Sequence, residues 1–269
     1  MEPHVLYEKT GHIARITLNR PEVHNAFSPE SIVRLAEIWQ DFNQDDELWV
    51  ALVTGAGDRA FSSGADLGRL IPLYTGARPP EDDWDRRLLE NRAVISIAFL
   101  RRYVVYKPIV AAVNGFCLAG GTELVLATDI RIAAEHATFA LTEAKRGLVP
   151  GAGSMARLPR QVPYCKAAEI LLVGDHITAQ EAHRIGLVNE VVPAAELMPR
   201  AEEFAQKLAE NGPLAVRKIK EVMIRGSGVP LQDAFSIEDE VSRVVFASED
   251  AREGPRAFME KRKPQFKGR

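Results

Sequence analysis

The sequence of 269 residues predicts an α/β protein whose strands pair mainly in parallel. Strand patterns and helix patterns alternate from about residue 5 to about residue 193, which favours crossover connections. The stretches 49–55 and 107–115 are continuous apolar runs that end in glycine, as expected of strands buried on both faces. After about residue 195 only amphipathic helix patterns remain, which predicts a helical region at that end.

The first elements follow from turn and cap patterns. Residues 5–21 hold two runs rich in strand-forming residues around a Thr-Gly pair, which predicts a hairpin stopped by Pro21. Residues 28–44 repeat apolar side chains on one stripe, with Ser28 as the N-cap and Pro29 at the first helical position. A helix therefore follows the hairpin.

The middle of the chain predicts further strands and helices, together with one irregular segment. Residues 71–92 combine proline, glycine and clustered charges, which predicts a mobile loop plus a helix, and such loops often cover sites. The helix at 178–188 has Thr178 as its N-cap and Gly186 near its end. The other expected elements are a helix at 122–128, strands at 129–135 and 138–141, and a helix at 164–174.

We expect two parts in the chain: a core, 1–195, and a helical appendage, 196–269. The appendage has apolar faces in excess of what one short helical region buries, and such faces often pack on a neighbouring copy. A homo-oligomer is therefore expected.

Composition excludes several classes of protein. The net charge of −3 gives no general attraction to nucleic acid or to an anionic membrane, and no apolar run approaches the ~18 residues of a membrane span. The start of the chain lacks a targeting pattern. The two cysteines, Cys117 and Cys165, could form one disulfide but more often indicate a reducing compartment, and the six histidines show no ligand spacing. We expect a soluble, cytoplasmic protein without a metal.

Two glycine motifs resemble known sites without fitting them. Residues 53–60 match GxGxxA after a strand, but the helix of a dinucleotide fingerprint does not follow. Residues 151–156 are not GxSxG, so Ser154 is not expected to be a nucleophile. In 61–67 and 119–124, glycines stand beside expected helix starts, whose unpaired N–H groups suit an oxyanion. The alternative is that these glycines only permit tight turns.

Two carboxylates lie in stretches that are otherwise rich in glycine and apolar residues, as expected of a buried core. Glu123 falls in the first turn of a helix that begins near Gly120, and Glu143 ends the short strand at 138–141. Carboxylates are rarely buried unless they are paired or hydrogen-bonded. Two of them beside an oxyanion site suit acid–base chemistry next to a carbonyl. The alternative is a helix-start residue and a solvated loop residue.

Six segments, in order along nearly the whole chain, resemble the crotonase superfamily of acyl-CoA enzymes, and most closely enoyl-CoA hydratases. They are "NRPEVHNAFS", "FSSGADL", "KPIVAAVNGFCLAGGTELVLATDIRIA", "FALTEAKRGLVPGAGSMARLPR", "GDHITAQEAHRIGLVNEVVP" and "REGPRAFMEKRKPQF". The resemblance implies a spiral of ββα repeats that carries the acyl-CoA site, with a C-terminal helical trimerisation region, assembled as a trimer or a dimer of trimers.

The resemblance also implies the chemistry. The backbone N–H groups of Ala65 and Gly120 match the oxyanion hole, and Glu123 and Glu143 match the catalytic pair. The implied reaction is the reversible addition of water across C2–C3 of a 2-enoyl-CoA, as in β-oxidation of fatty acids or related acyl-CoAs. Coenzyme A is then part of the substrate, and no separate cofactor is expected.

The same mapping implies the residues that bind CoA. Within 20–26 and 63–67 they are Ala26, Ser63, Gly64, Asp66 and Leu67. Phe258 and Lys261 match a contact made by the C-terminal end of a neighbouring subunit, although a solvated basic end is an equal reading of that tail.

Departures from the family pattern concern the acyl pocket. Thr142 replaces a common proline, Ser154 a glycine and Gly68 a lysine of some relatives, and the insertion at 75–90 is long. Other reactions of the superfamily, such as isomerisation or carnitinyl-CoA dehydration, therefore stay open. An RNA-binding role is disfavoured because the arginines Arg86, Arg87, Arg101 and Arg102 are few and balanced by acids.

Overall fold

Two sheets organise the chain, which the computed structural model describes over residues 2–91 and 93–269. The larger sheet has the order β1-β2-β3-β5-β7-β10 and the smaller one the order β4-β6-β8-β9. The strands are β1 (Val5–Thr10), β2 (Ile13–Leu18), β3 (Val50–Gly55), β4 (Ala60–Ser62), β5 (Ile109–Val113), β6 (Phe116–Leu118), β7 (Ile130–Ala134), β8 (Thr138–Ala140), β9 (Ile177–Thr178) and β10 (Glu190–Val192).

Pairing in the sheets confirms the predicted α/β class. β1 and β2 form the expected antiparallel hairpin, whereas β2, β3, β5, β7 and β10 are parallel neighbours. In the smaller sheet β4, β6 and β8 are parallel, and β9 runs antiparallel to β8.

Consecutive strands are shared between the two sheets, which produces a spiral of ββα turns. β3, β5 and β7 lie in the larger sheet, and each is followed by a three-residue strand, β4, β6 or β8, in the smaller one. Gly115 forms the corner between β5 and β6 with φ +149°, and a Cβ there would lie 2.2 Å from the Arg59 carbonyl oxygen. β4 and β6 are too short to show a strand period, so the sequence did not predict them.

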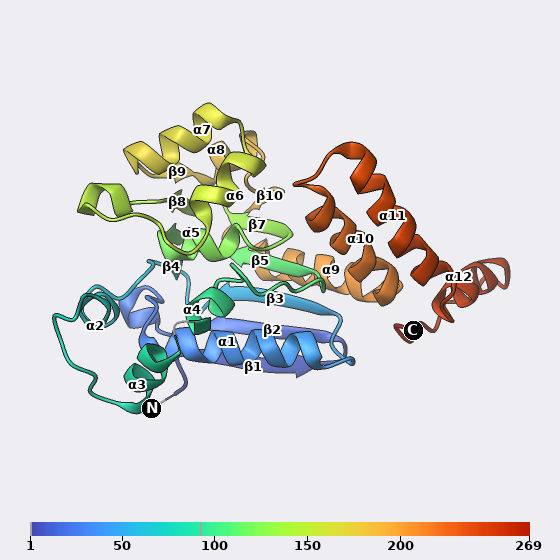
Figure 1. Cartoon of the computed structure of the whole chain (residues 1–269), viewed down its shortest axis with the longest axis horizontal. Coiled ribbons are helices and arrows are strands. Elements are labelled where there is room, and N and C mark those ends of the chain that lie inside the picture. The colour runs from blue at the N-terminus through green and yellow to red at the C-terminus, as the bar shows by residue number, and fades with distance from the viewer. Residues whose placement is uncertain (1, 92) are drawn as a thin grey trace.

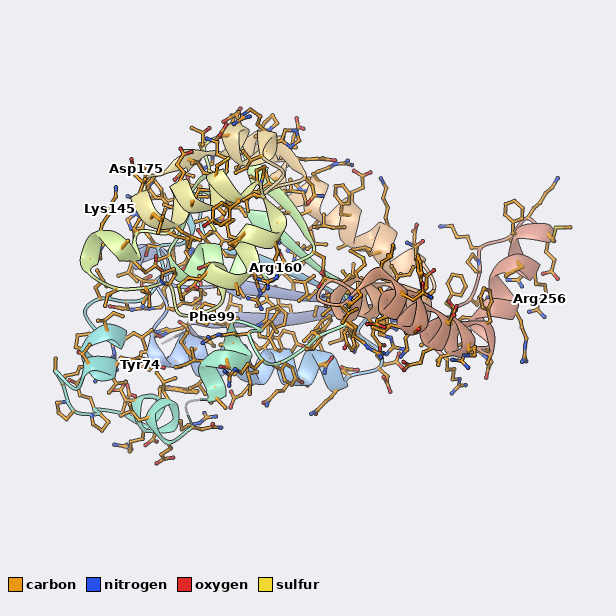
Figure 2. The ribbon with its side chains drawn as sticks, turned by 45° about the horizontal axis from the view of Figure 1, so that its top comes forward. Tyr74, Phe99, Lys145, Arg160, Asp175 and Arg256 are labelled. Carbon is orange, nitrogen blue, oxygen red and sulfur yellow. The ribbon has the colours of Figure 1, made fainter. Side chains whose placement is uncertain are left out.

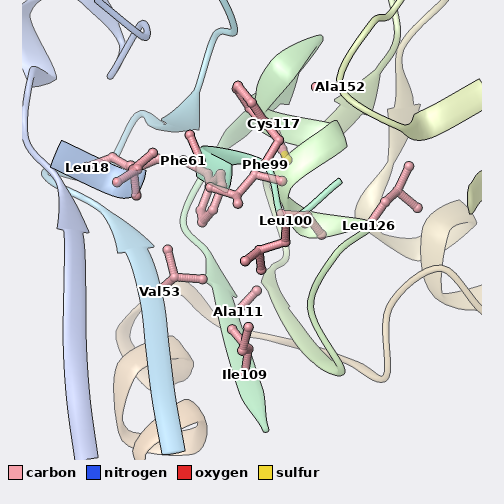
Figure 3. Packing of buried hydrophobic residues seen from close by; sticks show 14 of the residues in the cluster. Leu18, Val53, Phe61, Phe99, Leu100, Ile109, Ala111, Cys117, Leu126 and Ala152 are labelled. Carbon is pink, nitrogen blue, oxygen red and sulfur yellow. The ribbon is translucent and has the colours of Figure 1, made fainter. Parts of the chain in front are cut away.

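Both faces of the larger sheet are buried, and this explains the continuous apolar runs. Ala51 and Val53 of β3 face the main cluster beneath α1 (Pro29–Gln44), which Figure 3 shows from close by. Val50 and Leu52 face a second cluster formed with α9 (Leu197–Glu210). Because side chains alternate along a strand, burial of both faces removes the polar half of the pattern.

Helix α1 begins where the sequence predicts. The Ser28 hydroxyl accepts from the Ser31 N–H at 3.1 Å, and the Ser31 hydroxyl accepts in return from the Ser28 N–H. Trp39, fully buried, donates from its indole N–H to the carbonyl oxygen of Ala98 at 3.0 Å. This bond ties α1 to α4 (Ala93–Ala98) beside the cleft described below.

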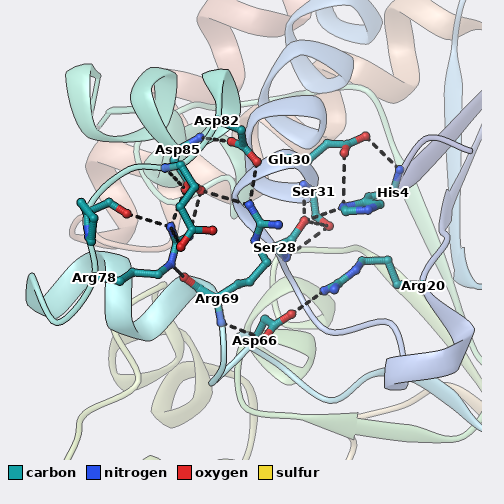
Figure 4. Close-up of polar contacts among 12 residues, drawn as sticks. His4, Arg20, Ser28, Glu30, Ser31, Asp66, Arg69, Arg78, Asp82 and Asp85 are labelled. Carbon is teal, nitrogen blue, oxygen red and sulfur yellow. Dashed lines mark hydrogen bonds and ion pairs between the residues drawn. The ribbon is translucent and has the colours of Figure 1, made fainter. Parts of the chain in front are cut away.

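The irregular segment contains two short helices, α2 (Leu70–Thr75) and α3 (Asp83–Glu90), where the sequence predicted one; Arg92 lies outside the described residues. Ion pairs hold it in place (Figure 4). Asp85 is fully buried and accepts two hydrogen bonds from Arg78, and Arg69 pairs with Asp82 at 2.6 Å.

Three of the remaining core helices lie where the sequence predicts helices. Thr178 caps α8 (Ala179–Arg184) by accepting from the Glu181 N–H at 3.2 Å, and Gly186 follows with φ +79°. The helix expected at 164–174 is α7 (Tyr164–Ala168), which continues as one π-helical turn, η3 (Glu169–Val173). α5 (Gly120–Val125) overlaps the helix expected at 122–128, whereas α6 (Ser154–Gln161) was not predicted.

The C-terminal part consists of helices, as predicted, but they differ in what they contact. α9 covers one face of the larger sheet, whereas α10 (Pro213–Gly226), α11 (Leu231–Phe246) and α12 (Asp250–Met259) extend away from the two sheets (Figure 1). Large apolar side chains on these three helices are exposed, among them Met223, Phe235 and Phe246. The division at residue 195 and the trimerisation role of 196–269 stay predictions.

Candidate active site

A cleft of about 830 Å³ lies between α2, α4, α5 and the segment 142–152. Its lining includes Glu123, Glu143, Ala65 and Gly120, which come from separate parts of the chain. The rest of its wall is mainly apolar, with Leu70, Ile71, Tyr74, Ile95, Phe99, Leu148 and Val149. The structure therefore gathers the four residues expected to do chemistry around one apolar space.

Two backbone loops meet at the floor of this cleft, and glycines allow them to approach. Gly64 has φ +91°, and a Cβ on it would lie 2.6 Å from the Ala119 Cβ and 3.2 Å from the Gly120 nitrogen. A Cβ on Gly121 would lie 2.6 Å from the Ser62 carbonyl oxygen. Both glycines are therefore needed for close approach, beyond the tight-turn role that was the alternative.

The amides of Ala65 and Gly120 are held in place by their neighbours. Phe27 fixes the first loop, because its N–H donates to the Gly64 carbonyl at 2.8 Å and its carbonyl accepts from the Asp66 N–H at 3.0 Å. Gly120 is the first residue of α5, after Ala119, whose φ is positive at 50°. Within the described ranges, neither amide donates a hydrogen bond, so both can bind an oxyanion in the cleft.

Glu123 lies in the first turn of α5, as predicted, and is only 3% exposed. Its Oε1 accepts from the Ala152 N–H at 2.8 Å, the Ser154 N–H at 3.1 Å and the Ser154 hydroxyl at 2.9 Å. Burial raises the pKa of this carboxyl, and the hydrogen bonds from Ser154 and Ala152 oppose that rise by stabilising the charged form.

Glu143 begins η2 (Glu143–Arg146), a 3₁₀ turn, and does not end a strand, because β8 stops at Ala140. Its Oε2 is buried and finds no hydrogen-bond partner among the described residues. Burial, with a smaller contribution from the charge of Glu123, raises the pKa of Glu143 to about 7. Neither carboxylate is therefore a fully solvated surface residue, and both line the same cleft.

The residues expected to bind CoA lie mostly at this cleft. Ala26, Ser63, Asp66 and Leu67 line it, whereas Gly64 is buried in the same loop and is not part of the lining. The carboxylate of Asp66 is engaged within the protein (Figure 4): it pairs with Arg20 at 2.8 Å and accepts from the Gly68 and Arg69 N–H groups. Asp66 thus stabilises the loop that carries Ala65.

Phe258 and Lys261 are not brought to the cleft of their own chain. Phe258, near the end of α12, is 82% exposed, and Lys261 follows that helix. Figure 2 places Arg256 of the same helix at the opposite end of the molecule from Tyr74 in the cleft wall. Their expected contact with CoA in a neighbouring subunit stays a prediction.

Sequence reasoning missed the hydroxyl of Ser154 as a partner of Glu123. It considered Ser154 only as a rejected nucleophile and as a departure from a glycine, because no local pattern joins two residues that are distant in sequence. It also missed Phe99 and Ile95, which line the cleft from α4 and the residues after it. Thr142, another departure, does line the cleft.

The structure also bears on the cysteines, the metal ligands and the membrane spans considered from the sequence. Cys117 is buried and Cys165 exposed, and both are free, so no disulfide joins them. In the described part of the chain no cluster of three or more His, Cys, Asp or Glu side chains could hold a metal ion. No helix there is long and apolar enough to cross a membrane.

Comparison with known proteins identifies the family. Residues 8–269 match the family described as enoyl-CoA hydratase/isomerase. The chain is 40% identical to the enoyl-CoA hydratase EchA19 of Mycobacterium tuberculosis, covering 99% of this chain and 97% of that protein. It is 39% identical to carnitinyl-CoA dehydratase of Escherichia coli, covering 97% of both.

A solved structure shows the same fold. Enoyl-CoA hydratase from Bacillus anthracis superposes with a TM-score of 0.89 at 37% identity, covering 99% of this chain and 100% of that one. The α/β spiral and the resemblance to the crotonase superfamily are thereby confirmed. The chain belongs to the enoyl-CoA hydratase/isomerase family of crotonase-type enzymes.

Proposed function

We propose that this protein is an enoyl-CoA hydratase, a hydro-lyase that adds water reversibly across C2–C3 of a 2-enoyl-CoA to give a 3-hydroxyacyl-CoA. The observation that carries the proposal is the arrangement of the cleft. Two carboxylates in unlike environments line it, together with two backbone N–H groups that donate to no other described residue. Hydration of a conjugated thioester needs these groups: a base for water, an acid for C2 and donors for the carbonyl oxygen.

In the proposed reaction the thioester oxygen accepts hydrogen bonds from the N–H groups of Ala65 and Gly120. This draws electron density from C3 and stabilises the negative charge that develops on the oxygen when water adds. Loss of one such donor typically costs about 3–4 kcal/mol of transition-state stabilisation.

The two carboxylates then divide the proton transfers. Glu123, whose charged form is hydrogen-bonded, takes a proton from the water that attacks C3. Glu143, whose pKa is raised to about 7, holds a proton near neutral pH and delivers it to C2. After the product leaves, Glu123 holds the proton taken from water and Glu143 has lost its own. A proton must therefore pass from Glu123 to Glu143, directly or through solvent, before the next turnover.

CoA binding completes the proposal. Ala26, Ser63, Asp66 and Leu67 lie at the cleft and are proposed to hold the pantetheine and nucleotide arm. A homo-oligomer would supply Phe258 and Lys261 from a neighbouring subunit, as the sequence resemblance implies. CoA enters as part of the substrate, and a cytoplasmic location stays the expectation from sequence.

A second candidate is dehydration of carnitinyl-CoA or isomerisation of an enoyl-CoA on the same site. The sequence identity of 39% to a carnitinyl-CoA dehydratase favours dehydration of carnitinyl-CoA as the alternative reaction. These reactions would use the same cleft and an acyl thioester, as hydration does. They differ from it in the acyl group that the apolar wall must accept and in the bond that is changed.

The test is the loss of the conjugated-thioester absorbance of crotonyl-CoA and then of longer and branched enoyl-CoAs. Dehydration of carnitinyl-CoA is followed in the same assay as a gain of that absorbance. The E123Q/E143Q double variant, purified in parallel, controls for a hydratase from the expression host. Wild-type hydration with an inactive double variant supports the proposal. A wild type that binds CoA esters but hydrates none of the panel would overturn it.

A further inference from the structure

Ser154 is a buried polar side chain that the proposed reaction has not used. It is fully buried at the start of α6 and is not part of the cleft lining. Its hydroxyl lies 2.9 Å from Oε1 of Glu123 and donates to it, 31 residues away in sequence. Its own N–H and that of Ala152 donate to the same oxygen.

Three donors on one carboxylate oxygen leave the two oxygens of Glu123 unequal. Each oxygen has about two lone-pair directions, so Oε1 is saturated by the protein. Oε2 accepts nothing from the described residues, and Glu123 lines the cleft. Oε2 is therefore the oxygen available to a reacting water.

We propose that Ser154 is a positioning residue whose hydroxyl locks Oε1 of Glu123 against the loop 152–154, so that Oε2 faces the water as a charged base. This inference rests on the proposed function and goes beyond it, because it assigns a role to a side chain that does not touch the substrate. The backbone amides alone would hold Oε1 with two donors; the hydroxyl adds the third and restricts rotation of the carboxylate.

The other charged groups that face Glu123 are Arg157, on α6, and Glu143, across the cleft. The guanidinium of Arg157 donates to the carbonyl oxygens of Phe99 and Leu100, which holds it in place. The charge of Arg157 lowers the pKa of Glu123, and the charge of Glu123 in turn raises the pKa of Glu143. Substitution of Ser154 leaves both in place, so a change in titration reports on the hydroxyl.

The test compares S154A and S154G with wild type in the pH dependence of hydration. Removing a donor to the ionised carboxylate raises the pKa of Glu123, so the acidic limb of kcat should move upward by about one pH unit. At a pH on that limb kcat should fall about tenfold, with KM for the enoyl-CoA within about twofold of wild type, because one pKa unit is a tenfold change in the ionised fraction.

T128V is the matched control, since Thr128 is a buried hydroxyl just after α5 that donates to the Val125 carbonyl and touches neither glutamate. Its pH profile should coincide with that of wild type. An unshifted acidic limb in both Ser154 variants, or an equal shift in T128V, would overturn the positioning role.

A second measurement does not depend on turnover. The Glu123 carboxyl carbon can be followed by ¹³C NMR in glutamate-labelled protein, with E123Q identifying its resonance. An upward shift of its pKa in S154A supports the role of the hydroxyl, whether or not the wild type hydrates enoyl-CoAs. A wild type that hydrates none of them would contradict only the proposed function. Identical titrations in S154A and wild type would refute the role of Ser154 while leaving the proposed function intact.

Discussion

The two segments that carry the glutamates are built differently. Glu123 lies in a helix whose residues Gly120–Val125 are all buried, and its Oε1 has three donors. Glu143 begins a 3₁₀ turn whose next residues, Ala144–Arg146, are exposed, and its buried Oε2 has no partner among the described residues. One carboxylate is held by the core and the other by a surface turn.

The difference shows how one residue type can serve two roles in one cleft. Burial raises the pKa of both groups, but only Glu123 has hydrogen bonds that favour its charged form strongly. Environments that separate two carboxylates in this way assign the base and the acid. The following predictions test that division, from the largest expected effect to the smallest.

Removal of either carboxylate should give the largest loss. E123Q and E143Q each remove a proton-transfer group while keeping size, so kcat for hydration should fall by about 10²–10⁴ in each, as is typical for general acid–base groups. Steady-state assays with crotonyl-CoA measure this. Retention of more than about a tenth of wild-type activity in one variant would show that its glutamate is not needed for proton transfer.

T122V should destabilise the segment of Glu123. The Thr122 hydroxyl is buried and lies 2.5 Å from the Cys117 carbonyl oxygen and 3.1 Å from that of Ala140, tying α5 to β6 and β8. Valine keeps the shape but leaves buried carbonyls without this donor, so the free energy of unfolding should fall by about 1–3 kcal/mol in urea titrations.

The matched control is T142V on the segment of Glu143. No hydrogen bond from the Thr142 side chain to another described residue is present, and that side chain is partly exposed. Its effect should stay within about 0.5 kcal/mol. Equal losses in the two valine variants would mean that the segments are anchored alike.

Stability should depend on pH through Glu143. Its pKa is about 7 in the folded protein against an ordinary value of 4.5, so between these values the folded state binds more protons than the unfolded state. Stability from this group is full below about pH 4.5 and is lost as pH rises to about 7. After allowance for solvent at this partly exposed group, the loss should be about 1 kcal/mol.

E143Q lacks the titrating group, so urea unfolding of wild type and E143Q from pH 4.5 to 7 measures the difference. The stability of wild type relative to E143Q should decrease across this window. A difference that is constant with pH would show that Glu143 titrates normally in the folded protein.

The smallest effect is expected at the ion pair between Lys145 of η2 and Asp175, which Figure 2 shows on the surface. Both side chains are largely exposed, and exposed pairs contribute about 0–1 kcal/mol. K145A should therefore change the free energy of unfolding by less than about 1 kcal/mol and kcat by less than about twofold. A tenfold loss of kcat would show that this tether places Glu143.

Local patterns accounted for much of the fold. The cap at Ser28, the Thr178–Gly186 boundaries and the buried runs of β3 and β5 were all readable, because each depends on residues close in sequence. The second strands of the repeats were not, since β4 and β6 have three residues each and exist only through pairing in the smaller sheet.

The candidate site divides in the same way. Sequence placed Glu123 in a first helical turn and glycines beside the start of α5, and resemblance to the family supplied the pairing with Glu143. The helix start expected at 61–67 was wrong, because α2 begins only at Leu70 and Ala65 instead pairs with Phe27. Only the folded chain shows that Gly64 and Gly121 let two loops touch, and that Glu143 begins a turn after its strand has ended.

The sequence by itself therefore determined the α/β class, the ends of α1, the start of α8 and the candidate carboxylates, because caps, periodicity and turn residues act over a few positions. The tertiary structure decided what each carboxylate experiences. Ser154 reaches Glu123 across 31 positions, and the buried Oε2 of Glu143 has no donor among the described residues. The ionisation of the two glutamates therefore depends on desolvation and on contacts between distant segments. These long-range contacts exist only after folding, and no short stretch of residues encodes them.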